Sequence, residues 1–179
     1  QSTKIVRENK SLKDTVERFH KLSSAFQDIA DMIELGNEEG DEELIPEIRE
    51  MLDGFIHDLE TLKAETLLTG EYDANNAILR LNAGAGGTES SDWCSMLYRM
   101  YTRWAESHGY SIEVLDYLDG DVAGIKSVTI QINGENAYGR LRSEHGVHRL
   151  VRISPFNAAG KRQTSFVSCD IMPELTNEI

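Results

Sequence analysis

The residues of this sequence that could do chemistry gather around Ser154-Pro155-Phe156, inside the basic stretch of an acidic chain. Residues 137–167 hold six Arg or Lys side chains against one acid, whereas the whole chain has a net charge of −13. Pro155 fixes its backbone angle φ, which predicts a rigid hairpin tip. A hydroxyl, an aromatic ring and nearby cations are groups that bind single-stranded RNA. The charge pattern alone would also fit an ordinary solvated strand.

A second candidate site is the glycine-rich segment 84–87, which follows a β-like run and precedes a helix expected over 88–108. Thr88 is expected to cap this helix, and the acids Glu89 and Asp92 favour its positive end. Free N–H groups at such a helix start can bind a phosphate or an oxygen of a base. The glycine spacing matches neither a Walker loop nor a dinucleotide fingerprint, so a turn that merely packs is the alternative.

Metal and catalytic groups are poorly represented. His145 and His148, with Glu144 beside them, lack a third convincing ligand, which favours polar contacts in a turn over a metal site. The acids of residues 116–121 lack the ligand pattern of a calcium loop. No nucleophile and base pair emerges, so we predict no catalytic residue, no metal, no cofactor and no small-molecule substrate.

The composition is typical of a cytoplasmic chain of one or two domains. Two cysteines are too few for a disulfide framework, which favours a reducing compartment. No apolar run approaches the length of a membrane span and no signal peptide precedes the first helix, so no membrane partner is expected. The first residue is Gln1 and not Met, which suggests that the natural N-terminus is missing.

The first 70 residues predict helix throughout. Apolar residues recur every three or four positions over 12–33 and in heptad fashion over 48–62. Gly36 is expected to end the first helix and Gly70 the second. The two segments predict an antiparallel hairpin or a small bundle, whose apolar stripes bury one another or a further helix. A spacer without chemistry is the simplest role, and a partner-binding face is the alternative.

Short strands dominate the rest of the chain. Alternating or β-branched runs predict strands over 77–81, 111–118, 127–132 and 146–153, with a return strand from Lys161 to Phe166. The fold class expected is therefore α+β. A helical N-terminal domain over residues 1–75 precedes a mixed domain over 76–179, in which short and mainly antiparallel strands surround one long helix.

Four motifs in this order resemble bacterial class I peptide chain release factors of the second type. They are Gly84-Ala85-Gly86-Gly87-Thr88-Glu89, Gly146-Val147-His148-Arg149-Leu150-Val151-Arg152, Ser154-Pro155-Phe156 and Arg162-Gln163-Thr164-Ser165-Phe166. The resemblance implies translation termination at UAA and UGA codons, with the ribosomal decoding centre and the mRNA as partners. In this family a Gly-Gly-Gln domain directs hydrolysis of peptidyl-tRNA. No Gly-Gly-Gln occurs in this sequence, so the chain is expected to be a fragment that binds and is not an enzyme.

The resemblance also assigns roles around the tip. Ser154 would hydrogen-bond the second codon base, because a hydroxyl can both donate and accept. Pro155 would stiffen the loop and Phe156 would shape the apolar side of the pocket. Gly86 and Glu89 would read the first base through their backbone.

The third base falls to the two strands that flank the tip. Val151 and Thr164 match the positions that handle it. Gln163 stands where the family commonly has a histidine, so its stacking among the bases is weaker. Support for the pocket or the RNA backbone is expected from Arg149, Arg152, Lys161 and Arg162. Two alternatives stay open, namely a ribosome-rescue or regulatory relative without codon discrimination and a helical interaction module.

Overall fold

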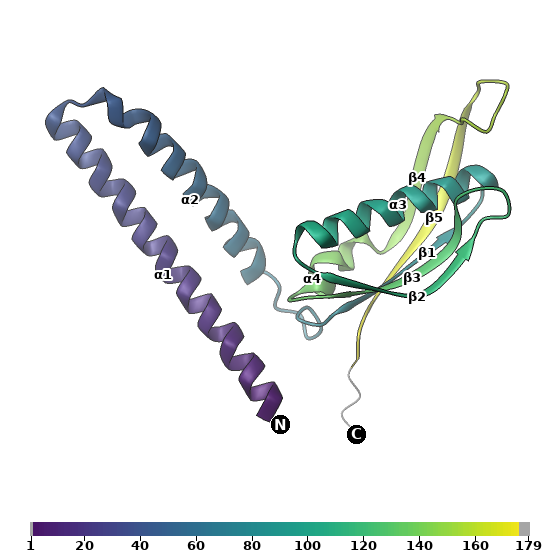
Figure 1. The fold of residues 1–179 in the computed structure, drawn as a ribbon, viewed down its shortest axis with the longest axis horizontal. Coiled ribbons are helices and arrows are strands. Elements are labelled where there is room, and N and C mark those ends of the chain that lie inside the picture. The colour runs from purple at the N-terminus through teal and green to yellow at the C-terminus, as the bar shows by residue number, and fades with distance from the viewer. Residues whose placement is uncertain (1, 176–179) are drawn as a thin grey trace. The chain divides into compact units, whose positions relative to one another are not determined.

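The computed structural model describes residues 2–175 and divides the chain into two units, Gln1–Leu67 and Leu68–Ile179. The first unit is a hairpin of two long helices (Figure 1). Its elements are α1 (Ser2–Glu39), the 3-10 turn η1 (Glu42–Leu44) and α2 (Ile45–Thr66). The domain boundary expected after residue 75 stays a prediction.

The sequence predicts that the first helix ends at Gly36, but in the structure this helix continues to Glu39. A glycine inside a helix costs only about 1 kcal/mol, which a long helix tolerates. The reversal comes instead at Gly40, whose φ of 63° lies in the left-handed region that favours glycine. The second helix ends at Thr66, four residues before Gly70.

The apolar stripes of this hairpin are only partly buried. Phe26 and Phe55 meet with ring centroids 6.1 Å apart, and Arg18 pairs with Glu65. Ile29 is the one buried apolar residue among the described residues of this unit. The two apolar stripes therefore cover each other only along a narrow seam. Most of their surface stays exposed, because two helices alone enclose little surface.

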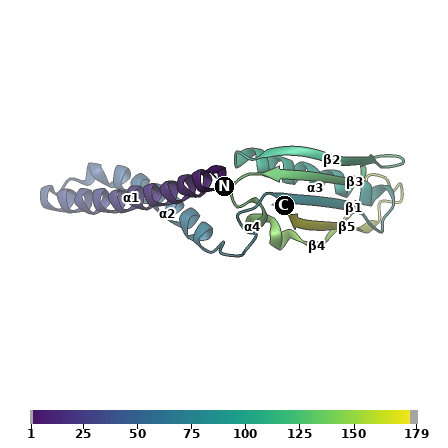
Figure 2. The ribbon, with the colours of Figure 1, turned by 90° about the horizontal axis from the view of Figure 1, so that it is seen from below.

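The second unit is a five-stranded antiparallel sheet with one long helix across one face (Figure 2). The strands run in the order β2-β3-β1-β5-β4. Their bounds are β1 (Ala77–Ala83), β2 (Ser111–Asp119), β3 (Ile125–Asn133), β4 (Gly146–Ile153) and β5 (Arg162–Pro173). The long helix is α3 (Thr88–Ser107). The α+β fold class is confirmed.

The core lies between α3 and the three central strands. Alternate residues of each strand point to α3, as the two-residue period of a strand requires. The buried set comprises Leu79, Leu81, Cys94, Leu97, Tyr101, Val128, Ile130, Ile132, Val167 and Cys169, among others. Burying apolar side chains of this size stabilises a fold by roughly 1.5–3 kcal/mol each. The sheet and α3 thus form the rigid base from which the tip projects.

Two features of this unit were not predicted. A short helix, α4 (Ala137–Leu141), and the 3-10 turn η2 (Arg142–Glu144) precede β4. The return strand also runs seven residues past Phe166 to Pro173, because residues 167–173 pair with β1 along its whole length. Among residues 2–175, no helix combines the length and apolar character needed to cross a membrane.

The Ser154 tripeptide lies where β4 and β5 join. These two strands pair antiparallel, with Val151 opposite Thr164 and Ile153 opposite Arg162. The hairpin rises beyond the other strands of the sheet (Figure 1). The tripeptide therefore lies at the tip of a two-stranded hairpin, as the sequence predicts.

Candidate functional site

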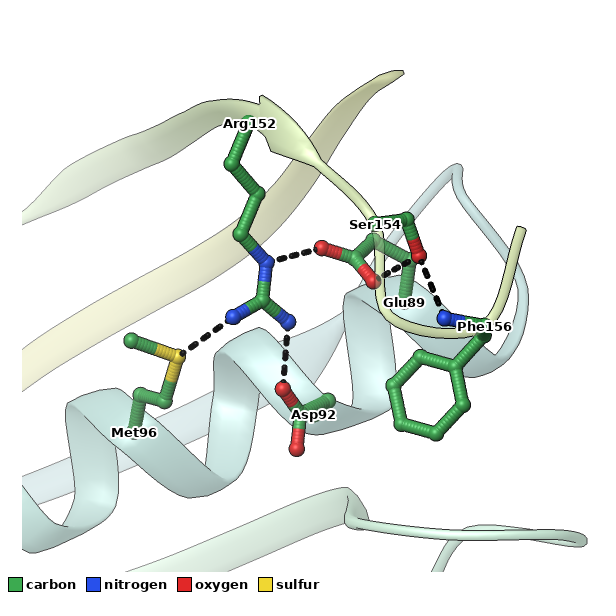
Figure 3. A network of polar contacts seen from close by, with 6 residues as sticks. All are labelled: Glu89, Asp92, Met96, Arg152, Ser154 and Phe156. Carbon is green, nitrogen blue, oxygen red and sulfur yellow. Dashed lines mark hydrogen bonds and ion pairs between the residues drawn. The ribbon is translucent and has the colours of Figure 1, made fainter. Parts of the chain in front are cut away.

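The tip is tied to α3 by a cluster of charged side chains. Arg152, near the end of β4, donates from its Nε to Glu89 on the first turn of α3. A second nitrogen, Nη2, lies 2.5 Å from the Oδ2 atom of Asp92. A third, Nη1, lies 3.7 Å from the sulfur of Met96 (Figure 3). One guanidinium thus joins a strand to three successive positions along one helix face.

The hydroxyl of Ser154 belongs to the same cluster. Its Oγ donates to the Oε2 atom of Glu89 at 2.5 Å and accepts from the backbone N–H of Phe156 at 3.1 Å (Figure 3). Ser154 is 5% exposed, whereas the Phe156 ring is 47% exposed and points away from this hydroxyl. Pro155 is exposed as well. The hydroxyl is therefore held in a fixed direction at the base of the tip.

Sequence reasoning gave Glu89 a backbone role and Asp92 only an effect on the helix end. In the structure both carboxylates bind Arg152, and the Glu89 side chain is 7% exposed. A signal for this pairing was present, because residues three apart on a helix share one face. Two acids at that spacing, in an acidic chain with one basic stretch, predict a shared cation.

Glu89 is held in its charged form. The hydrogen bond from Arg152 lowers the pKa of the Glu89 carboxyl below its usual value of 4.5, and the Ser154 hydroxyl and the charge of Arg152 act in the same direction. Burial opposes them by raising the pKa, but the hydrogen bond outweighs it. At neutral pH Glu89 is therefore a carboxylate that only accepts hydrogen bonds.

This shift predicts how the stability of the second unit depends on pH. Because the pKa of Glu89 is lower in the folded chain than in the unfolded one, its contribution is complete above about pH 4.5 and is lost as the pH falls below that value. Urea unfolding between pH 7 and pH 3 should show this loss. Glu89→Gln should give a flatter profile over the same range, and an equally steep profile would contradict the assignment.

The glycine loop packs beside β5, although its residues 84–87 are exposed. Gly84 N–H donates to the carbonyl oxygen of Phe166 at 2.8 Å, and Phe166 N–H donates to that of Ala85 at 3.2 Å. Gly86 has a φ of 131°, and a Cβ there would lie 2.7 Å from the Cβ of Ser165. This position therefore requires glycine, and the loop comes to lie directly beside the return strand of the tip.

The start of α3 differs from the expected cap. Gly87 occupies the N-cap position with a φ of 58° and offers no side-chain hydrogen bond, and Thr88 is the first helical residue. Because Thr88 is already inside the helix, it is not the cap that the sequence predicted. Gly87 takes the cap position, and a φ of 58° is most readily adopted by glycine. Ser90 holds the loop instead, because its hydroxyl lies 2.9 Å from the Gly84 carbonyl oxygen and 2.7 Å from that of Gly87.

The register of β4 and β5 divides the other candidate residues between two faces. Residues directly opposite each other share a face, and successive residues alternate. Arg152 and Gln163 lie opposite each other on the α3 side. Val151 and Thr164 form the next pair and lie on the other side, where both are exposed. Ser154 and the pair of Val151 and Thr164 thus lie on opposite faces of one hairpin.

The remaining basic residues around the tip differ from Arg152 in their exposure. Arg149 lies opposite Phe166 on the face away from α3. Lys161 and Arg162 stand at the start of the return strand. All three side chains are exposed, so they are available to an anionic partner.

The histidines near β4 make internal contacts. The Nε2 atom of His148 lies 2.9 Å from the carbonyl oxygen of Glu144, and the Tyr101 hydroxyl donates to the Glu144 carboxylate at 2.7 Å. His145 accepts from the N–H of Ile171 at 3.3 Å. Within residues 2–175, no group of three His, Cys, Asp or Glu side chains is placed to hold a metal ion.

Comparison with known proteins identifies the family. The model of the PCRF domain matches residues 1–169. The chain belongs to the PCRF domain family. This PCRF chain is 53% identical over 174 residues to "Peptide chain release factor 2" of Clostridium perfringens. The aligned residues cover 97% of the chain and 48% of that relative. It is 54% identical over 176 residues to the protein of the same name from Lactiplantibacillus plantarum, with 98% and 47% covered.

A solved structure agrees with these sequence relatives. "RF2 of Thermus thermophilus" matches this PCRF chain with a TM-score of 0.70 and 42% identity, over 99% of the chain and 49% of that structure. The PCRF chain therefore spans about half the length of the relatives that it matches. The resemblance to bacterial release factors of the second type is confirmed.

Proposed function

We propose that this chain contains the stop-codon-reading part of a bacterial translation termination factor that recognises UAA and UGA in the ribosomal A site. The observation that supports this most directly is the convergence of three segments, 84–89, 151–156 and 162–166, at one end of the sheet. The first segment is distant in sequence from the other two, which flank one hairpin tip, and all three match motifs of the release factor resemblance. The names of the relatives agree with a role in translation termination.

Within this proposal the two faces of the hairpin have separate tasks. Ser154 meets the second base from the α3 side, and its low exposure restricts the approach to a narrow angle. Val151 and Thr164 meet the third base from the opposite side. The loop containing Gly86 and the start of α3 offers backbone N–H groups to the first base.

The exposed cations Arg149, Lys161 and Arg162 would bind the RNA backbone in the small-subunit decoding centre. An acidic chain with one basic strip can contact nucleic acid at that strip without binding it everywhere. We infer a cytoplasmic location from the small number of cysteines and from the proposed role on the ribosome. The helical region 1–75 would act as a spacer or as a partner-binding module.

Hydrolysis of peptidyl-tRNA is not assigned to these residues. The sequence contains no Gly-Gly-Gln, and we propose that a Gly-Gly-Gln domain outside these 179 residues directs it. In this proposal the chain recognises the codon and does not catalyse.

Binding to programmed ribosomes tests the proposal. The chain should bind complexes with UAA or UGA in the A site at least about tenfold more tightly than complexes with CAA, which differs from UAA only in its first base. Ser154→Ala should weaken stop-codon binding about fivefold, because one hydrogen bond to a base is worth about 1 kcal/mol. Fluorescence anisotropy with labelled chain measures both effects.

Ser143→Ala is the matched control, since Ser143 is an exposed serine of the same basic stretch outside the tip. This variant should bind like the unchanged chain. Equal affinity for stop and sense codons would refute codon recognition and would favour a rescue or regulatory role.

A further inference from the structure

The hydrogen bonds of Ser154 leave its hydroxyl only one way to meet a ligand. A hydroxyl has one proton and two lone pairs. The proton points to Glu89 and one lone pair accepts from the N–H of Phe156. One lone pair is left, so a ligand that approaches this oxygen must donate.

This direction is imposed by Glu89 and, through it, by Arg152. A carboxylate can only accept, so the shared proton must come from Ser154. Arg152 donates to the other carboxylate oxygen of Glu89 and keeps that oxygen turned away from the serine. Arg152 therefore fixes the direction of the Ser154 hydroxyl indirectly, through the carboxylate of Glu89.

We propose that Glu89 is a positioning residue that sets the hydrogen-bond polarity of Ser154 and, through it, the balance between adenine and guanine at the second codon base. The inference rests on the proposed codon-reading function. Adenine presents an amino donor where guanine presents a carbonyl acceptor. The amino group matches the free lone pair directly, whereas the carbonyl requires the Ser154 proton to leave Glu89.

Glu89→Gln reverses this polarity. The guanidinium of Arg152 can only donate, so it retains the amide oxygen and turns the amide NH2 group toward Ser154. The serine then accepts from Gln and its proton becomes free for a carbonyl. The ratio of UGA to UAA affinity, measured on programmed ribosomes, should rise about tenfold, as expected for one hydrogen bond to a charged group.

Asp92→Asn is the matched control. It removes the same charge from the same arginine, but Asp92 binds Arg152 and makes no contact with Ser154 among the described hydrogen bonds. Its codon ratio should stay within about twofold of the unchanged chain. In the Ser154→Ala background, Glu89→Gln should no longer alter the ratio, because a double-mutant cycle isolates the shared contact.

The outcomes separate this inference from the proposed function. An unchanged chain that does not distinguish stop from sense codons would refute the proposed function. If it does distinguish them, a Glu89→Gln variant with an unchanged ratio of UGA to UAA affinity would overturn this inference alone. That result could take two forms, namely unchanged affinities or equal gains in affinity for both codons. The second result would mean that Glu89 merely competes with the codon for Ser154.

A measurement without ribosomes covers the case in which Glu89→Gln does not fold. Carbon-detected NMR titration of the Glu89 carboxyl in the unchanged chain and in Ser154→Ala reports the bond directly. The midpoint should be higher in Ser154→Ala, because the lost donor no longer favours the carboxylate. Identical midpoints would show that the serine proton does not point to Glu89, and the inference would fail.

Discussion

Gly124→Ala should lower the free energy of unfolding of the second unit by about 3 kcal/mol. Gly124 has a φ of 72°, which costs an L-residue about 1–2 kcal/mol. A Cβ there would also lie 2.3 Å from the carbonyl carbon and oxygen of Ser91 and 2.6 Å from the backbone nitrogen of Asp92. Backbone atoms of a helix cannot yield as a flexible side chain would, so overpacking adds a similar cost. Urea denaturation followed by tryptophan fluorescence measures the change.

Gly109→Ala provides a closely matched control. Gly109 has the same φ of 72°, but nothing lies within 4 Å of the position of its Cβ. It should therefore cost only the backbone term, about 1 kcal/mol. Similar losses for both variants would mean that the turn between β2 and β3 does not press against α3. The comparison matters for the site, since the crowded backbone is in the first turn of α3, next to Glu89.

Arg152→Met should destabilise the second unit by about 2 kcal/mol. The substitution keeps much of the apolar stem but leaves Glu89, 7% exposed, without its cation. Removing one partner of a fully buried ion pair costs about 3–5 kcal/mol, and the partial exposure of Arg152 and Asp92 reduces the effect. Chemical denaturation at pH 7 gives the magnitude. Under the proposed function, the same variant should also lose codon selectivity, because Glu89 would no longer be oriented.

Arg149→Met serves as the control for this variant. Arg149 lies on the same strand, three residues earlier, with its side chain exposed on the opposite face. Its replacement should change the free energy of unfolding by no more than about 0.5 kcal/mol. If both variants were equally stable, the pairing of Arg152 with the two acids would contribute nothing measurable.

Local patterns were sufficient to predict most elements of the fold. The run of strand, glycine loop and helix over 77–108 follows from alternation, glycine and helical spacing, and all three elements are present. The short helix over 137–141 was missed because its five residues are too few for a periodic pattern. It depends on tertiary contacts instead, since Gly139 N–H donates to the carbonyl oxygen of Asp73 at 3.0 Å.

The residues of the candidate site could be proposed from the sequence, but the contacts between their side chains could not. The tripeptide and the glycine loop could be identified from residue types and spacing. That Arg152 turns toward α3 while Arg149 turns away depends on strand register, which a single residue of slip would invert. The strand order, with β1 between β3 and β5, is equally invisible in the linear sequence. The roles of the individual residues at the tip stay predictions.

The hydrogen bond between Ser154 and Glu89 also limits how the tip can be engineered. These two residues are separated by 65 positions, yet each completes the polar contacts of the other. A chimera that receives a different tripeptide at 154–156 would keep a nearly buried carboxylate selected for a serine hydroxyl. Tripeptide grafts should therefore be designed as exchanges of two distant segments, with position 89 varied together with the tip.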